Sequence, residues 1–259
     1  MLSPAITVAR KELIDHLRDT RALVATVLLT LMGPIIVGLI VTVKSTSGGR
    51  MALVIALMAS VFTVVATFTG GMGVAADSIA GERERKSLLP LLSNATAPLG
   101  IIIGKWLAAS VFATACLLIT FVSFVLIIGF SSGQLPVHAA SFLQALASLA
   151  ALCALCTALQ IMISAQARNV KEAQTYLSFV MFGIMAFAMW MAFRSEIAQD
   201  WWHLLPLGGQ LRLLQLTLTG GTITAVQTVV LVIFTSLATT AVLIYSAALF
   251  RRDEVVYGK

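Results

Sequence analysis

A glycine-rich motif and a cysteine pair are the parts of the sequence whose residue types and spacing could perform chemistry. Gly100-x-x-x-Gly104-Lys105-Trp106 is spelled like a phosphate-binding loop, which holds nucleotide phosphates with backbone N–H groups and a lysine. Its glycines are separated by three residues where four are required, and Trp106 stands where Ser or Thr must bind magnesium. We therefore do not interpret this motif as a nucleotide site.

Cys153 and Cys156 have the CxxC spacing of redox and zinc sites, but both lie inside an apolar segment, as does Cys116. A redox pair needs an accessible thiolate, and a zinc site needs further ligands that are missing nearby. The sequence favours helix packing by these small residues, and no metal site.

No catalytic constellation is visible elsewhere in the chain. His16, His138 and His203 are scattered among different loops, and neither an HExxH nor a GxSxG motif occurs. We predict that the chain is not an enzyme and binds no cofactor of its own.

The composition identifies the solvent of this chain as lipid. Of its 259 residues, 59% are hydrophobic and 11% are charged, with a mean hydropathy of +0.98. An average soluble domain has about 25% charged residues. The net charge of +6 could indicate nucleic acid, but the basic residues form no long run and no aromatic-interleaved patch. We expect membrane lipid and no nucleic acid as partner.

Crossing the hydrocarbon requires about 20 apolar residues in a helix. The sequence predicts an all-α, polytopic membrane protein with six transmembrane helices at Ala22–Val43, Met51–Ala76, Trp106–Phe130, Ala139–Ala165, Ala173–Phe193 and Thr222–Phe250.

The basic residues set the orientation, because Lys and Arg are retained on the cytoplasmic side. With the N-terminus inside, 13 of the 17 Lys and Arg residues fall on the inner side. We predict a multi-pass protein of the cell inner (plasma) membrane with both termini cytoplasmic. No short cleavable apolar segment precedes the first span, which we expect to be a retained anchor.

The chain divides into three regions on this basis: residues 1–21, 22–250 and 251–259. The first is predicted to be an amphipathic interfacial helix, with Ile6, Leu13 and Leu17 on one face. A solvated leader that only sets the topology is the alternative. The second is the six-helix transmembrane domain, and the third is a cytoplasmic tail.

Glycine and proline residues in the first two spans predict local features of these helices. Gly33-Pro34 predicts a bend in the first span, as a gating point or as a packing feature. Gly70, Gly71 and Gly73 predict close helix contacts at the end of the second.

The outer segment 194–221 contains Trp201 and Trp202 and then an apolar stretch that is too short to cross the membrane. We predict a re-entrant or interfacial segment, which either shields an exit or covers the bundle. Leu207-Gly208-Gly209-Gln210 within it has the letters of an ATPase signature, but it lies on the side away from ATP.

The cytoplasmic loop 77–105 is the most informative segment. A charged half precedes an apolar half, with Pro90 breaking the helix between them. This composition predicts a docking surface; the alternative is a solvated charged face whose leucines rest on the bilayer. The residues in question are Glu82, Arg83, Glu84, Arg85 and Lys86 in the first half, and Leu88 and Leu89 in the second.

Met181, Met185 and Met189 recur every four residues in the fifth span. This stripe of flexible side chains suits either a path for an apolar substrate or ordinary helix packing.

No ionisable residue lies at the centre of a span, which disfavours an ion-coupled carrier.

Two motifs resemble the permeases of ABC-2 type transporters, including their sodium-efflux and copper-enzyme-maturation branches. Ala9-Arg-Lys-Glu-Leu-Ile-Asp-His-Leu-Arg-Asp19 is similar to their "RKEL…LRD" opening. Gly81-Glu-Arg-Glu-Arg-Lys-Ser-Leu-Leu-Pro-Leu-Leu-Ser93, followed by Gly104-Lys105-Trp106, is similar to their "GERERGTLEPLLxxPxxxxxxxxGK" loop. The turn 44–50 departs from the sodium-efflux branch, which usually has a large outer domain there.

This resemblance implies the membrane-spanning subunit of an ATP-driven exporter. Two copies, or one copy and a homologue, would pair and sit on two ABC ATP-binding subunits, which would hold ATP and magnesium. The charged loop would be the coupling helix, and the N-terminal segment a connecting helix in which Lys11, Glu12 and Arg18 pair with it. An ion, drug, peptide or lipid cargo fits equally. The rivals are a non-transporting scaffold or sensor and an ion-coupled secondary carrier.

Overall fold

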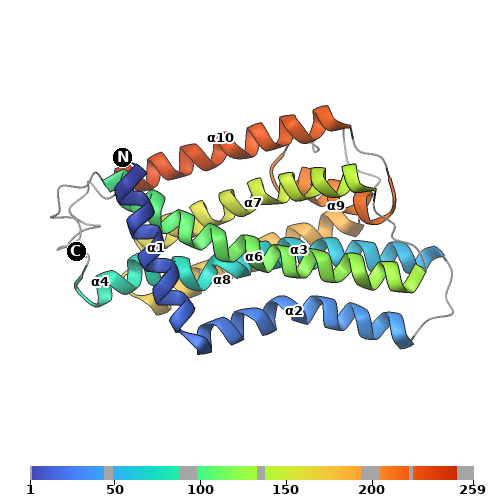
Figure 1. Cartoon of the computed structure of the whole chain (residues 1–259), viewed down its shortest axis with the longest axis horizontal. Coiled ribbons are helices and arrows are strands. Elements are labelled where there is room, and N and C mark those ends of the chain that lie inside the picture. The colour runs from blue at the N-terminus through green and yellow to red at the C-terminus, as the bar shows by residue number, and fades with distance from the viewer. Residues whose placement is uncertain are drawn as a thin grey trace.

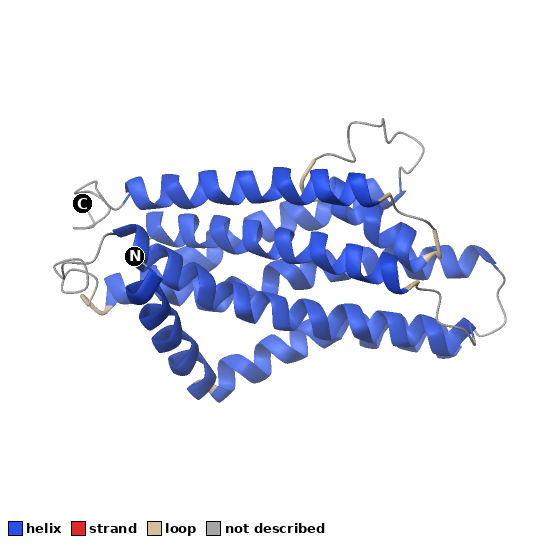
Figure 2. Cartoon of the chain, turned by 45° about the horizontal axis from the view of Figure 1, so that its top comes forward, coloured by secondary structure: helices blue, strands red, loops and turns tan. Residues whose placement is uncertain are grey.

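The computed structural model describes residues 2–43, 49–87, 98–132, 138–193, 205–221 and 224–249. Within these ranges every regular element is a helix and no strand is present (Figure 2). The prediction of an all-α protein is therefore confirmed.

Among the described residues, six helices are long and apolar enough to cross a membrane, and they run side by side along the molecule (Figure 1). This confirms the predicted number of spans. In chain order they are α2 (Thr20–Val43), α3 (Gly49–Ala76), α6 (Pro98–Ser132), α7 (Ala139–Gln166), α8 (Val170–Phe193) and α10 (Ala225–Leu249).

Helix α1 (Leu2–Arg18) lies across one end of the bundle, packed on α6 (Figure 1). Ala5, Ala9 and Glu12 are buried on its inner face, whereas Ile6 and Leu17 are 60% and 56% exposed. The exposed apolar side chains fit a helix that lies in the membrane interface. Asp19 separates α1 from α2 and caps α2, because its Oδ1 accepts a hydrogen bond from the N–H of Ala22 at 3.1 Å.

Helix α3 continues beyond its predicted end through a π-helical turn, η1 (Asp77–Gly81), into the short α4 (Glu82–Glu84). Helix α6 begins at Pro98, before its predicted start at Trp106. The predicted loop 77–105 is thus helical at both ends. Lys105 suggested a helix end, but its charge is compensated inside the bundle, so the helix continues past it.

Pro34 lies inside α2, as the bend prediction required. A proline has no N–H to bond the carbonyl of Thr30 four residues before it. The hydroxyl of Thr120 on α6 lies 2.9 Å from the carbonyl of Cys116 and 3.3 Å from that of Thr30, so it shares one proton between them and replaces only part of the missing hydrogen bond.

The glycines of α3 differ in what they contact. A Cβ at Gly70 would lie 2.6 Å from Cys116 Cβ on α6, and one at Gly71 would lie 2.8 Å from Thr157 Cγ2 on α7. Gly73 has nothing within 4 Å, so its prediction as a contact residue is wrong: it lies on an exposed side of the helix.

Helix α9 (Gly208–Leu218) lies at the end of the bundle opposite α1 (Figure 1). It is packed against α7, α3 and α8. Gln210 is fully buried and donates to Thr235 Oγ1 on α10 at 3.0 Å, while its Oε1 accepts from the N–H of Leu207. Trp201 and Trp202 lie outside the described residues.

Candidate functional site: an ionic cluster at the α1 end

Lys105 of α6 is the centre of a buried ionic cluster that consists of Lys11, Glu12, Glu82 and Lys105. Its side chain is 0% exposed, and its Nζ lies 2.9 Å from Glu12 Oε1 and 2.9 Å from Glu82 Oε1. The same Nζ donates to the carbonyl of Ser78 at 2.6 Å. One ammonium group therefore joins α1, η1, α4 and α6.

Lys11 closes the cluster from its exposed side. Its Nζ lies 3.4 Å from Glu82 Oε1 and 3.5 Å from Glu12 Oε1, and it also approaches Asp15 at 3.9 Å. Partial burial lowers the pKa of Lys11, but the Glu12 and Glu82 carboxylates outweigh it, and the pKa is raised overall. Two ammonium groups thus balance the two carboxylates of the cluster.

The close approach of α1 to α6 depends on Gly104. A Cβ at this position would lie 2.6 Å from the carbonyl oxygen of Ala5 and 2.7 Å from Val8 Cβ, both on α1. The neighbouring Trp106 fixes α6 on its other side, because its Nε1 donates to the carbonyl of Ala154 on α7 at 2.9 Å. The Gly-Lys-Trp sequence therefore positions α1, the ionic cluster and α7.

The π-helical turn η1 is held open by a hydroxyl group from α7. Ser164 Oγ donates to the carbonyl of Ala76 at 3.2 Å and accepts from the N–H of Ala80 at 3.2 Å. These two backbone groups would bond each other in a regular α-helix. A side chain inserted into the hydrogen-bond ladder is a physical cause of such a local distortion.

The charged residues after Glu82 bind to different elements. The guanidinium of Arg83 donates to the carbonyls of Ala165, at 2.8 Å, and Ala167, where α7 ends. A cation at a helix C-terminus satisfies the free carbonyls and matches the helix dipole. Glu84 Oε2 accepts from the N–H of Val170 at 3.3 Å, at the start of α8. The segment is thereby bound to the α7–α8 turn.

Arg85 and Lys86 form the exposed tip of the described segment. Arg85 contacts Asp77 at 2.8 Å, and its side chain is 65% exposed. Lys86 has a φ of 57°, and the N–H groups of Lys86 and Ser87 donate to the carbonyls of Arg83 and Glu82. This is the Schellman arrangement that ends a helix with a residue in the left-handed region.

Several residues proposed as the docking surface thus have partners within the chain. Glu82 and Arg83 point inward, Glu84 bonds the start of α8, and Arg85 and Lys86 remain outward. Leu88 and Leu89 lie outside the described residues.

The three α1 residues expected to pair with the loop behave differently. Lys11 contacts Glu82, and Glu12 contacts mainly Lys105. Arg18 is exposed at the end of α1 and has no ion pair within the described ranges.

Sequence reasoning did not assign Gly104, Lys105 and Ser164 to this site. Lys105 carried a usable signal, since a lone cation inside an apolar helix requires a counter-ion. Nothing in the sequence indicated Ser164.

The methionines of α8 do not form a continuous exposed stripe. Met181 and Met189 pack against the core, whereas Met185 is 36% exposed.

No group of three or more metal-ligating side chains occurs in the part of the chain that the structure describes.

Within the described ranges, six helices are long and apolar enough to cross a membrane, and this arrangement defines a polytopic α-helical membrane protein. Residues 6–255 match the family described as ABC-2 family transporter protein, and the chain belongs to this family. The ABC transporter permease protein NatB of Bacillus subtilis (strain 168) is similar to this chain, with 32% identity over 152 residues. That alignment covers 56% of this chain and only 39% of the relative. The resemblance inferred from the two motifs is confirmed.

Proposed function

We propose that this chain is the membrane-spanning permease subunit of an ABC exporter and that a separate subunit hydrolyses the ATP. The observation that carries the proposal is the ionic cluster together with Arg83 and Glu84. These groups bind one short charged segment to α1, α6, α7 and α8. The family match and the similarity to the Bacillus permease protein NatB support the same function.

In this proposal the outward residues touch the ATP-binding subunit and the inward residues transmit its movement. Arg85 and Lys86, together with Leu88 and Leu89, supply the contact, and Glu84 lies at its edge. Glu82 and Arg83 pass a displacement to the helices that they bind. Energy enters as a difference in contact free energy between two conformations of the ATP-binding subunits.

The remaining parts of the complex follow from the same proposal. Two ATP-binding subunits hold ATP and magnesium, and a second copy of this chain or a homologue completes the membrane part. The chain lies in the plasma membrane with both termini in the cytoplasm. The exposed side of α8, including Met185, lines the path of the cargo.

The test is co-expression with candidate ATP-binding subunits, followed by purification and measurement of ATP hydrolysis in proteoliposomes. Combined Arg85→Glu and Lys86→Glu should reduce the co-purified ATPase at least tenfold. A matched control is Arg10→Glu with Arg21→Glu, which makes the same charge change on exposed residues of α1 and α2. We expect the control to retain the ATPase.

Two results would overturn the proposal. One is ATP hydrolysis by this chain purified alone. The other is undiminished ATPase recovery and activity with the Arg85 and Lys86 variant, provided that its melting temperature in detergent equals that of the wild type.

A further inference from the structure

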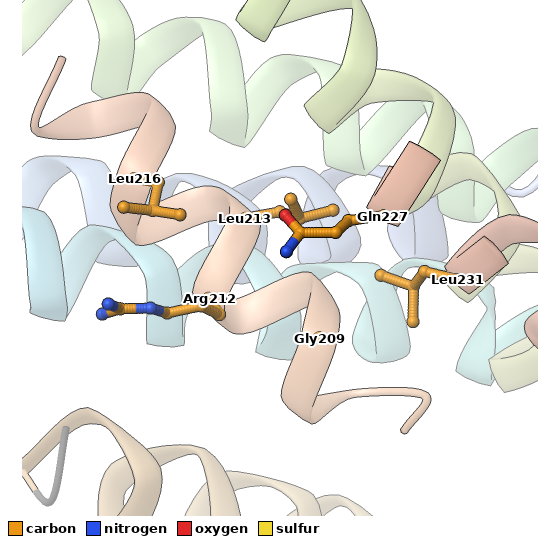
Figure 3. Close-up of a pocket in the computed structure, with 6 residues that line it drawn as sticks. All are labelled: Gly209, Arg212, Leu213, Leu216, Gln227 and Leu231. Atoms are coloured by element: carbon orange, nitrogen blue, oxygen red, sulfur yellow. The ribbon is translucent and has the colours of Figure 1, made fainter. Parts of the chain in front are cut away.

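A small cavity with one cationic wall lies between α9 and the first turns of α10 (Figure 3). Its volume is about 130 Å³. It lies at the end of the bundle opposite the ionic cluster, and nothing in the proposed docking of an ATP-binding subunit uses it. The residues that line it are Gly209, Arg212, Leu213, Leu216, Gln227 and Leu231.

Arg212 belongs to a helix that is otherwise almost entirely enclosed. Nine of the 11 residues of α9 are buried. The exceptions are Arg212 and Leu216, which lie one helical turn apart and both line the cavity. In Figure 3 the amide of Gln227 reaches from α10 toward α9, whereas the side chain of Arg212 extends away from α9 on the side opposite Gln227. Among the described residues, Arg212 has no ion pair and no side-chain hydrogen bond.

The size and polarity of the cavity select a compact anion. Drug-sized ligands occupy pockets of about 300–1,000 Å³, so this cavity of about 130 Å³ is too small for them. A guanidinium carries five N–H donors and binds phosphate through two parallel hydrogen bonds. Gln227 adds amide donors in the first turn of α10, where the helix dipole also favours negative charge.

The apolar surface next to the cavity identifies where such an anion comes from. Gln227, Leu231 and Phe234 lie on one side of α10 at the spacing of successive helical turns. Leu231 is buried, with 1% exposure, and closes the cavity from the inside, whereas Phe234 is 51% exposed on the surface of α10 next to it. A phosphate held at Arg212 would therefore have an apolar track beside it, as a phospholipid requires.

We propose that this cavity is a phosphate-binding site and that an anionic phospholipid headgroup occupies it, with the acyl chains along α10. Arg212 binds the phosphate, Gln227 lines the cavity as its second polar side chain, and Phe234 contacts the lipid chain. The site is independent of ATP hydrolysis and fixes the position of α9 against α10.

The experiment measures phosphatidylglycerol bound to the full chain, purified with any subunits that accompany it, by native mass spectrometry. Arg212→Gln should reduce the bound lipid at least tenfold, and Arg212→Lys should leave an intermediate amount. Arg50→Gln is the matched control, because it removes the same charge at the same end of the bundle from α3, a helix that does not border the cavity. Gln227→Leu changes an exposed side chain and should reduce binding severalfold, even if Arg212→Gln folds poorly.

A second arm separates the two sources of phosphate. If inorganic phosphate raises the melting temperature of the wild type but not of Arg212→Gln, while no phosphatidylglycerol is retained, the site binds free phosphate and the lipid assignment is overturned. Equal lipid binding by wild type, Arg212→Gln and Gln227→Leu, with no effect of inorganic phosphate, would overturn the site itself.

Discussion

At the α1 end of the bundle Lys105 joins carboxylates from two other elements, whereas at the opposite end α9 is held to α10 by a neutral hydrogen bond from Gln210 to Thr235. Buried charges must stay paired, because an unpaired buried charge is far more costly than a lost neutral hydrogen bond. A buried amide and hydroxyl can exchange partners at a smaller cost. Losing the charged contact at the α1 end should therefore destabilise the protein more than losing the neutral contact at the opposite end.

The largest test of this contrast is Lys105→Met. It leaves Glu12 and Glu82 buried without their shared cation, and breaking a buried ionic group in this way costs about 3–5 kcal/mol. We expect a strongly lowered melting temperature in detergent. Combining it with Glu12→Gln and Glu82→Gln should recover part of the loss. A Lys105→Met protein as stable as the wild type would show that the cluster does not hold the α1 end.

Gly104→Ala tests whether the contact between α1 and α6 must be close. The new methyl group would meet Ala5 and Val8 at well below van der Waals distance, and overpacking of this kind costs about 1–3 kcal/mol. Its control is Gly73→Ala, which adds the same methyl group where nothing lies within 4 Å. Thermal melting in detergent should show destabilisation for Gly104→Ala alone; equal melting temperatures would contradict the close contact.

Gln210→Leu tests the neutral hydrogen bond between α9 and α10 at the end of the bundle opposite α1. It removes the hydrogen bonds to Leu207 N–H and Thr235 Oγ1, at a cost of about 2 kcal/mol for two bonds. The loss should be smaller than that of Lys105→Met in the same melting assay. If Gln210→Leu were the more harmful of the two, the contrast between the two ends would be reversed.

Lys86→Gly should change the stability least, and it should raise the stability where the other substitutions lower it. Lys86 has a φ of 57°, which costs an L-residue energy that glycine avoids, so the variant should gain about 1 kcal/mol. The control is Arg85→Gly, because Arg85 has a φ of −79°, where glycine relieves no strain and should lower the stability instead. A lowered melting temperature for Lys86→Gly would contradict the proposed helix end.

The helices were predictable because each depends on a continuous apolar stretch. Patterns of this kind placed α7 to within one residue. The three apolar residues grouped on α1 do not share one environment, because Leu13 packs on the core while Ile6 and Leu17 are exposed. The start of α6 was not predicted, because a lysine can be buried in the bundle only when carboxylates such as those of Glu12 and Glu82 compensate its charge, and the sequence did not show this pairing.

The direction of the charged side chains was also beyond the sequence. Glu82 and Arg83 have the composition of a solvated face, and only the packing of α1, α6 and α7 turns them inward. Gly73 and Gly71 belong to the same motif, yet only Gly71 meets a neighbouring helix. These distinctions depend on tertiary contacts between segments that are far apart in the chain.

The π-helical turn has a consequence for rotational phase. An i→i+5 turn holds one residue more than an α turn, and successive helical residues are about 100° apart. In an uninterrupted helix Gly81 would take the direction that Glu82 now has, and Glu82 would rotate away from Lys105. The extra residue that Ser164 accommodates thus decides which side chain of the family motif meets the buried lysine. Deleting or inserting one residue in this short turn would point every charged side chain that follows it in a different direction.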